Sequence, residues 1–373
     1  MAFWKLHNNG VLEPGAVVAP NERLSWGKTI GLGAQHVVAM FGATFVFPLL
    51  MGLNPQLAVM MSGVATLIFL AVVRHRVPSY LGSSASFVGV ATAIYAQGGK
   101  PDGVSGAMFW CGAGLLVVGL IIHFMGSQVI HRALPPVVTG AVVMLIGFNL
   151  APVVATVYWP QDQWIAFLVM LIVIGLSVGL RGFAGRIAIF LSLIIGYVLS
   201  FAADKLFGPI VRTAADGTVT ETFRVDWSKV IEADWIGFPP VTDLTSWQFG
   251  GTGNVVGFHA PNFNLAYALI ALPVVIALIA ENTGHIKAVA EMTGESLDPY
   301  MGRAVAADGL TSMLATAVGA GPTTTYAENI GVMAATRVYS TAAYVVAAIV
   351  AIGFGFSPKF GAIVSATPGG VLG

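Results

Sequence analysis

Charge is scarce in this chain of 373 residues: only 9% of them are Asp, Glu, Lys or Arg, and their formal charges sum to zero. A soluble domain of this length carries far more charge, so the composition excludes a soluble fold. The sequence also lacks any basic tract, which argues against a nucleic-acid partner. Hydrophobic residues make up 56% of the chain, and the mean hydropathy is +0.83. The composition therefore predicts a protein that crosses a membrane many times.

Cysteine is almost absent too, because Cys111 is the single one. It cannot form a disulfide within the chain, and its apolar surroundings predict a buried, inert thiol. No HExxH pattern and no serine–histidine pair in a nucleophile context occurs, so neither an enzyme nor a metal or cofactor site is predicted. Residues 1–28 begin without the apolar core of a signal peptide and are predicted to form a cytoplasmic segment.

Long apolar runs follow one another along the rest of the chain. A membrane span needs about 20 apolar residues, or fewer when it packs inside a bundle. A twelfth run begins at Pro358 and is still open at Gly373, which predicts that the chain is a fragment of a longer transporter, with a non-functional fragment as an alternative. The eleven complete runs are Thr29–Gly52, Pro55–Val73, Pro78–Ala96, Val104–Gly126, Leu134–Ala155, Trp164–Leu180, Ile187–Ala203, Leu265–Ile286, Met301–Val318, Thr323–Val338 and Thr341–Phe356.

Lysine and arginine predict the orientation of these runs. Lys5, Arg23 and Lys28 precede the first run, and the other positive charges in short connections fall mostly on the same side of the membrane. By the positive-inside rule the N-terminus is cytoplasmic. The long connection 204–264 is then extracytoplasmic, and alternating residues in Thr218–Val225 predict a small hairpin there.

Two of the runs are interrupted in the same way. The third opens with Pro78–Phe87 and the tenth with Gly321–Asn329, and both stretches place Gly, Ser and Thr where a continuous apolar helix is expected. They are seven runs apart, so they cross the membrane in opposite directions. Short interrupted spans at matching places in two halves indicate a transporter's midplane site. Close helix packing is the alternative, but it accounts only for the small residues and not for Glu328.

Ionisable residues inside the predicted spans are candidates for function. Glu281 and His285 are four residues apart and share one helix face. They have no third metal ligand nearby, so a mutual ion pair is the main structural alternative. Removal from water favours the protonated form of a carboxylate, as a proton-coupled carrier requires. Asp308 is open to three roles, namely ligand, proton relay or helix–helix hydrogen bond, and His36 to packing or function.

Glu328 follows the interruption of the tenth run and is predicted to begin a half-helix with free N–H groups. Its carboxylate disfavours an anionic ligand and favours a neutral one that is rich in N–H donors. Together with Glu281 and backbone N–H groups of both interrupted spans, it predicts a flat frame of donors and acceptors. Such a frame complements a pyrimidine ring.

The stretch Glu328–Arg337 resembles the signature of the nucleobase:cation symporter-2 (nucleobase–ascorbate transporter) family, and Gln35-His36 resembles its first-span motif. Glu before Asn329 is similar to the uracil branch rather than the xanthine/urate branch. The resemblance implies an all-α polytopic fold of seven-plus-seven inverted repeats, with short extended segments in spans 3 and 10 and with spans 12–14 largely missing. A core domain would comprise residues 29–126 and 265–356, and a gate domain 134–203 and the truncated 357–373.

The resemblance also implies proton-coupled uracil uptake across the inner membrane, by a core that moves against the gate, with a homodimer as a further expectation. The coupling ion would be H+, with no cofactor. Family members carry Phe and Gly where this chain has Ala85 and Ala327, so thymine, related pyrimidines and purines such as xanthine stay open. The implied substrate-binding residues are Ala85 and Ala327 through backbone N–H, with Glu281 and Glu328; the implied proton-coupling or supporting residues are Glu281, His285, Tyr326, Asn329, Asp308 and His36.

Overall fold

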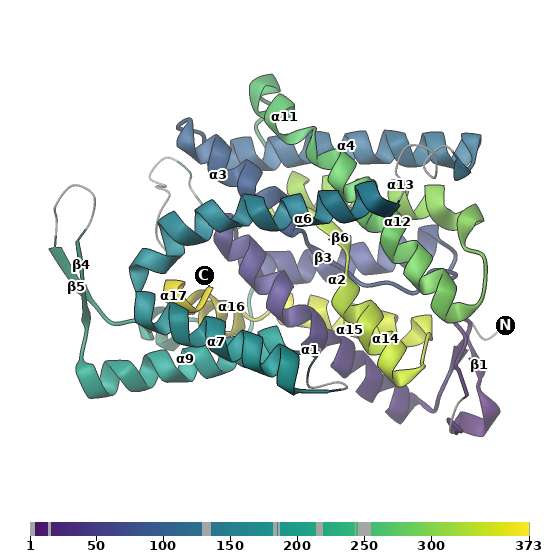
Figure 1. The fold of residues 1–373 in the computed structure, drawn as a ribbon, viewed down its shortest axis with the longest axis horizontal. Helices are drawn as coiled ribbons and strands as arrows, with labels where there is room; N and C mark the ends of the chain where they lie inside the picture. Colours follow the sequence, from purple (N-terminus) through teal and green to yellow (C-terminus); the bar gives the residue numbers. More distant parts are fainter. Residues whose placement is uncertain are drawn as a thin grey trace.

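The computed structural model describes residues 4–13, 16–128, 136–181, 185, 187–213, 219–242, 244 and 255–372, and helices dominate them (Figure 1). Four described helices are long and apolar enough to cross a membrane, or up to six if each of two bent pairs forms one span. The four are α1 (Trp26–Leu50), α2 (Pro55–Val72), α4 (Pro101–Met125) and α9 (Ala188–Phe207); the pairs are α11 (Leu265–Ala271) with α12 (Val274–Thr293) and α15 (Thr341–Gly355) with α16 (Pro358–Ser365).

Each predicted apolar run contains helical structure, although residue 134, where the gate was predicted to begin, lies outside the described residues. The run predicted as continuous over Leu265–Ile286 is instead bent by 41°. The bend lies at Pro273, whose ring cannot continue the helical hydrogen bonding. The remaining elements of the spans are β3 (Leu81–Ser83), η2 (Ala85–Phe87), α3 (Val88–Ala96), α6 (Pro136–Val153), η3 (Val154–Tyr158), η4 (Trp159–Gln161), α7 (Gln163–Gly179), α13 (Asp298–Ala317), β6 (Thr323–Thr325), α14 (Ala327–Thr336) and α17 (Gly369–Leu372).

Local sequence explains where several helices begin. Asn54, Asp162 and Ser340 precede α2, α7 and α15, and each side chain accepts a hydrogen bond from a backbone N–H of the first turn. These N–H groups have no partner inside the helix, so the caps stabilise each start by about 1 kcal/mol. Proline occupies the first helical position of α2 and α4, where its missing N–H costs nothing.

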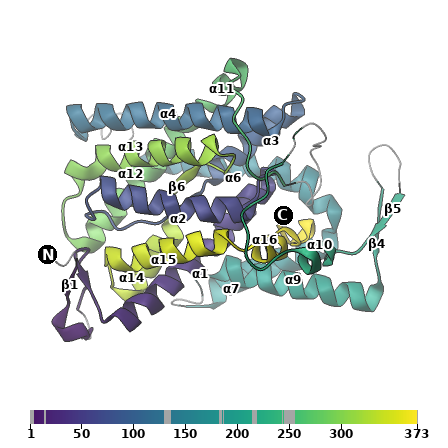
Figure 2. The ribbon, with the colours of Figure 1, turned by 180° about the vertical axis from the view of Figure 1, so that it is seen from behind.

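One region of the molecule is a stack of closely packed helices: α4, α13, α2 and α15 lie in successive layers (Figure 2). Glycines permit the closest contacts. A Cβ atom on Gly119 of α4 would lie 2.2 Å from the backbone nitrogen of Ala306, and one on Gly309 of α13 would lie 2.3 Å from that of Leu116. Only a residue without a side chain fits there, which is how membrane helices bring their backbones together.

A second region contains α7, α9 and a hairpin that projects from the body of the protein (Figure 1). The hairpin pairs β4 (Ile210–Thr213) with β5 (Val219–Thr222), which confirms the hairpin predicted around residues 218–225. Short α10 (Ser228–Glu232) follows it.

Phenylalanine rings join the two regions. Phe41 of α1 stacks on Phe45 and on Phe190 of α9, with ring centroids 4.7 and 5.6 Å apart. Phe354 of α15 stacks on Phe360 of α16 at 4.5 Å, and Phe360 lies 5.7 Å from Phe41. These five rings form an apolar contact that contains no hydrogen bond, and we call it the phenylalanine cluster.

The N-terminal segment packs on the connection between α14 and α15. Its short strands β1 (Lys5–Leu6) and β2 (Glu22–Arg23) pair in parallel, and η1 (Asn8–Gly10) lies between them. Val18 pairs with Val338, and the Thr341 hydroxyl donates to the carbonyl of Pro20 at 2.9 Å. The predicted segment 1–28 is therefore ordered where it is described, and α1 begins within it at Trp26.

Candidate functional site

The site is built around two short strands at the centre of the helix stack (Figure 1). Strand β3 pairs with β6 in antiparallel register, with Gly82 opposite Thr324 and Ser83 opposite Thr323. These strands are the short extended segments expected in spans 3 and 10, and they come from stretches more than two hundred residues apart in the sequence. Irregular backbone survives at membrane depth only where protein or a water-filled cavity satisfies it, and here each strand satisfies the other.

A hydroxyl from a neighbouring helix holds each strand in place. Thr66 Oγ1 of α2 accepts the N–H of Leu81 at 2.9 Å and donates to the carbonyl of the same residue at 3.4 Å. Ser312 Oγ of α13 does the same for Thr323, at 3.1 and 2.7 Å. Each hydroxyl therefore satisfies both backbone groups of one strand residue, and the two arrangements repeat each other across the pseudo-symmetric halves.

Each strand leads into a helix whose first residue has a free N–H group, whereas the next N–H in η2, that of Ser86, donates to Ser84 Oγ at 3.3 Å. Strand β3 ends at Ser83 and η2 begins at Ala85; β6 ends at Thr325 and α14 begins at Ala327. Among the described residues, no protein acceptor binds the N–H of Ala85 or that of Ala327. Free N–H groups at a helix start carry the positive end of the helix dipole, so both positions attract an acceptor such as a carbonyl oxygen.

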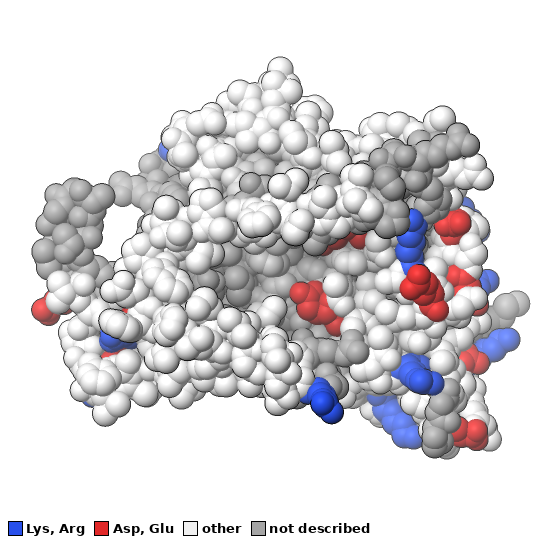
Figure 3. All heavy atoms as spheres, in the orientation of Figure 1, with Lys and Arg blue, Asp and Glu red and all other residues white. Residues whose placement is uncertain are grey.

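Carboxylates from two helices lie at the same place. Glu328 is in the first turn of α14, and Glu281 of α12 lies close enough to interact electrostatically with it and with Asp308. Glu281, Glu328 and Ala85 are partly exposed and Ala327 is exposed, although the strand residues before them are buried. Figure 3 shows acidic side chains inside a hollow that is surrounded by uncharged atoms. The partly exposed residues are thus those predicted to face a ligand.

His285 and Tyr326 adjoin the strands rather than the carboxylates. His285 Nδ1 lies 2.8 Å from the hydroxyl of Thr325, and the Tyr326 hydroxyl donates to the carbonyl of Ser83 at 2.7 Å. Thr44 Oγ1 of α1 donates to the same phenol oxygen at 3.1 Å. Both side chains were expected to support Glu281 or its proton, which stays a prediction; within the described residues their side-chain hydrogen bonds are with the β3–β6 pair and with Thr44.

Asn329 and His36 form a second pair under the site. The Asn329 amide donates to the carbonyl of His36 at 2.9 Å and lies 3.2 Å from its Nδ1. The His36 ring packs on Tyr344 with centroids 4.2 Å apart, and all three side chains are buried. His36, in the first span, therefore contacts the residue after Glu328, which leaves both packing and a supporting function open to it.

Asp308 is fully buried in α13, and the amide of Asn282 donates to its Oδ2 at 2.6 Å. This contact between α12 and α13 is the helix–helix hydrogen bond that was one of the three roles left open for Asp308. Sequence reasoning missed Asn282, Thr325 and Thr44. Each is a small polar residue in an apolar run, which by itself indicates only packing, but Asn282 directly follows Glu281 and Thr325 directly precedes Tyr326.

The donor set of this site suits a neutral planar ligand better than a metal ion. No group of three or more His, Cys, Asp or Glu side chains within the described ranges is arranged to hold a metal. The site instead offers two carboxylates as acceptors and two free backbone N–H groups as donors, and the described residues around the hollow in Figure 3 are mostly uncharged. Pockets for small molecules combine a few such oriented polar groups with apolar lining.

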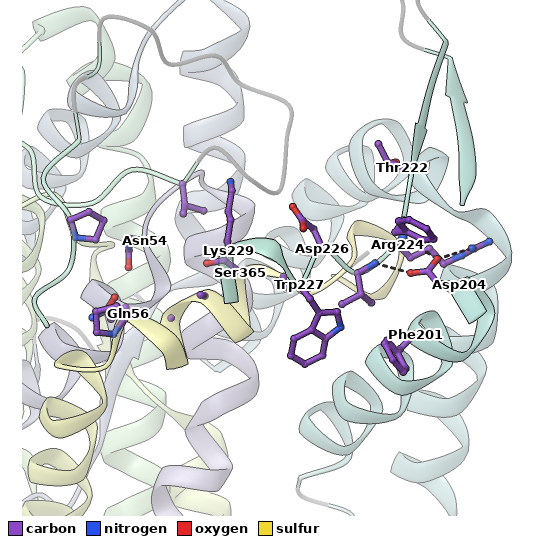
Figure 4. Close-up of a pocket in the computed structure, with 18 of the residues that line it drawn as sticks. Asn54, Gln56, Phe201, Asp204, Thr222, Arg224, Asp226, Trp227, Lys229 and Ser365 are labelled. Atoms are coloured by element: carbon purple, nitrogen blue, oxygen red, sulfur yellow. Dashed lines mark hydrogen bonds and ion pairs between the residues drawn. The ribbon is translucent and has the colours of Figure 1, made fainter. Parts of the chain in front are cut away.

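A separate cavity of about 780 Å³ lies beside α9, β5 and α16 and contains none of the predicted site residues (Figure 4). Its most polar feature is Arg224, which donates to Asp162 at 2.7 Å and to Asp204 at 3.1 Å. Asp204 also accepts the backbone N–H groups of Arg224 and Val225. Buried charges are generally paired and hydrogen-bonded, as these are. The Arg224 contacts therefore fix the loop after the hairpin to α7 and α9.

Comparisons with known proteins agree with this geometry. The chain is 44% identical over 378 residues to RutG of Escherichia coli (strain K12), which carries the name of a pyrimidine permease, and the match covers 99% of this chain and 78% of RutG. It is 33% identical to the uracil permease of Bacillus caldolyticus, covering 94% and 77% of the two chains.

Among solved structures, the transmembrane domain of the cyanobacterial bicarbonate transporter BicA is similar in fold, with a TM-score of 0.56 at 10% identity over 93% of this chain and 86% of that domain. This confirms the predicted seven-plus-seven transporter fold. A family model described as "Permease family" (xanthine/uracil permeases) matches residues 27–373. The chain is therefore a multi-pass membrane permease, not an enzyme, and belongs to the nucleobase:cation symporter-2 family of permeases.

Proposed function

We propose that this permease imports uracil, or a close pyrimidine relative, together with a proton. The observation that carries the proposal is that one free N–H group at each of two helix starts and two carboxylates meet at the paired strands β3 and β6. Uracil presents N–H groups and carbonyl oxygens in alternation around a flat, neutral ring. A site with both donors and acceptors on fixed backbone matches that edge at low cost in conformational entropy.

Each group at the site has a proposed role. Glu281 and Glu328 accept hydrogen bonds from the ring N–H groups, and the N–H groups of Ala85 and Ala327 donate to its carbonyl oxygens. His285, Tyr326, Asn329, Asp308 and His36 are proposed to hold the proton or to position the groups that do. The names of the relatives support a pyrimidine as substrate, since one is a pyrimidine permease and another a uracil permease.

The helix stack is proposed to act as the core, made of residues 29–126 and 265–356. It moves against a gate made of residues 134–203 and 357–373, as an elevator that carries the site across the membrane. The N-terminal segment 1–28 is proposed to be cytoplasmic and the connection 204–264 extracytoplasmic. Lys and Arg side chains gather mainly at the end of the molecule that carries the N-terminus, which supports this orientation (Figure 3). A homodimer in the inner membrane completes the proposal.

Uptake of radiolabelled uracil by cells that lack their own uracil transport tests the proposal. We expect the 373-residue chain to take up uracil. Uptake should fall at least tenfold, equivalent to about 1.4 kcal/mol, in Glu328→Gln and in Glu281→Gln, because each variant loses a charged acceptor. Glu232→Gln, on the surface of α10, is the matched control and should leave uptake unchanged.

Two further arms separate the alternatives. A proton uncoupler should abolish accumulation, and accumulation that survives it would refute proton coupling. Unlabelled uracil should compete for uptake and xanthine should not; the reverse order would assign the protein to purines. Unchanged uptake in Glu328→Gln would refute the assigned site.

A further inference from the structure

Four side chains form a continuous hydrogen-bonded row behind the site. Asp308 of α13 contacts Asn282 of α12 at 2.6 Å, and Asn282 Oδ1 lies 3.2 Å from the hydroxyl of Thr325 in β6. Thr325 in turn lies 2.8 Å from Nδ1 of His285, one helical turn from Asn282. Asp308, Asn282 and Thr325 are almost completely buried, whereas His285 is partly exposed at the end of the row.

The amide of Asn282 gives this row a fixed direction. Its Nδ2 donates both hydrogens, one to Asp308 Oδ2 and one to the carbonyl of Leu278 at 2.9 Å. Turning the amide over would place its oxygen against the Leu278 carbonyl, which has no hydrogen to give in any protonation state. The orientation is therefore set by the backbone and does not depend on whether Asp308 is charged.

The direction of the amide determines the tautomer of the histidine. Because Oδ1 of Asn282 faces Thr325, the single hydrogen of the Thr325 hydroxyl points to Asn282. That hydroxyl can then only accept from His285, so the imidazole carries a hydrogen on Nδ1. The backbone carbonyl of Thr325 also interacts with the imidazole and, like the hydroxyl, can only accept a hydrogen from it. Among the geometric hydrogen bonds between described residues none involves the other ring nitrogen, Nε2, which we therefore take as the basic atom.

We infer that Asn282 is a positioning residue that, through Thr325, holds His285 in the Nδ1–H form and leaves Nε2 as the atom that takes up the proton. The inference rests on the proposed proton-coupled function. When Nε2 binds a proton, the imidazolium still donates through Nδ1, so Thr325 and Asn282 need not move. Proton uptake and release then occur at one nitrogen while the row and β6 stay in place. The acidic groups of the site are Glu281, Asp308 and Glu328, which interact with one another through Glu281, and Glu281 shares a helix face with His285.

Nitrogen NMR of the protein labelled with ¹⁵N-histidine in lipid tests the tautomer directly. The chain contains seven histidines, so the His285 signals are assigned by their loss in His285→Gln. We expect a protonated Nδ1 and an unprotonated Nε2 in the wild type, and a majority Nε2–H form in Asn282→Leu and Thr325→Val. A wild-type Nε2–H signal, or an unchanged tautomer in both variants, would overturn the inference.

Matched variants separate this role from a general effect on folding. Thr325→Ser keeps the hydroxyl and should keep the Nδ1–H form. Thr283→Val removes a buried hydroxyl that bonds only to carbonyls of its own helix, at 2.7 and 3.1 Å, and should leave the tautomer unchanged. If Thr283→Val shifts the tautomer as far as Asn282→Leu does, the row is not what sets it, and the inference fails.

Transport kinetics give a second readout. In Asn282→Leu we expect the maximal rate of uracil uptake to fall about tenfold while KM changes less than about twofold, because the row touches the proton and not the ring. A rise in KM alone would overturn the positioning role. If the wild type transports no pyrimidine, the proposed function fails, but the tautomer measurement still decides the row, so the two failures are distinguishable.

Discussion

The two interrupted spans share one geometry and differ in chemistry. In both, a three-residue strand is held by a helix hydroxyl and leads into a helix that begins two residues later. The first, Pro78–Ala96, contains no Asp, Glu, Lys, Arg or His, whereas the second holds Glu328 and packs against α12 and α13 with their own carboxylates. The strand pair takes one strand from each interrupted span, whereas the carboxylate comes only from the second. Both interrupted spans therefore supply backbone groups, and the second also supplies a carboxylate.

The largest effect should come from separating the two strands. Gly82 of β3 lies where a Cβ atom would be 2.5 Å from the Tyr326 ring and 2.7 Å from Thr44 Oγ1. We expect Gly82→Ala to reduce uracil uptake below about a tenth of wild type, because overpacking of about 1–3 kcal/mol must displace a ring held by two hydrogen bonds.

The matched control is Gly31→Ala in α1, where a new Cβ meets nothing within 4 Å. Uptake and the thermal midpoint of the purified protein are measured for both variants. Equal values for the two would show that the strands tolerate displacement and that their pairing does not define the site.

An intermediate effect, a gain in affinity for uracil, should come from placing a side chain that contacts the ligand in the uncharged span Pro78–Ala96. Ala85 is partly exposed at the start of η2. We expect Ala85→Phe to lower KM for uracil about fivefold, since stacking of a base on an aromatic ring contributes about 1–3 kcal/mol. Ala85→Leu adds apolar volume without a ring and should not lower KM. An unchanged KM in Ala85→Phe would place the ligand away from this residue.

The smallest effect should come from substituting the hydroxyl groups that support the uncharged span Pro78–Ala96. Ser62 donates to the carbonyl of Val59 at 2.8 Å, so the Tyr80 phenol donates to Ser62, also at 2.8 Å. Ser62→Ala leaves the buried Tyr80 hydroxyl without an acceptor and should cost about 1–3 kcal/mol of stability, whereas Tyr80→Phe should cost less than about 1 kcal/mol. The double variant should be more stable than Ser62→Ala, as measured by thermal unfolding. Additive losses would contradict this hydrogen-bond direction.

Sequence alone predicted the elements of the site better than their contacts. The interruptions at Pro78 and Pro322 and the positions of Glu281 and Glu328 follow from helix breakers and carboxylates in apolar runs, which are local signals. The bend at Pro273 carried the same kind of signal and was still missed, because apolar residues continue on both sides of it.

Hydrogen-bond partners were harder to predict because they depend on how distant segments meet. For His285, an ion pair with Glu281, four residues earlier, was the structural alternative, and its side-chain hydrogen bond is to Thr325, forty residues later. Asn329 was expected at the proton site and bonds His36 in the first span. Threonine and serine within an apolar run satisfy their own helix carbonyls equally well, so nothing local distinguishes Thr283 from Thr325.

The phenylalanine cluster lies between residues of the proposed core and of the proposed gate, so it affects the rate of any movement between them. Flat rings attract one another by dispersion, and no donor or acceptor has to be broken and remade as one face shifts along another. If the core moves against the gate as proposed, a contact made of such rings gives that movement a shallow energy profile. In the proposed movement, the hydrogen bonds that hold β3 and β6 lie inside the helix stack and would move with the ligand.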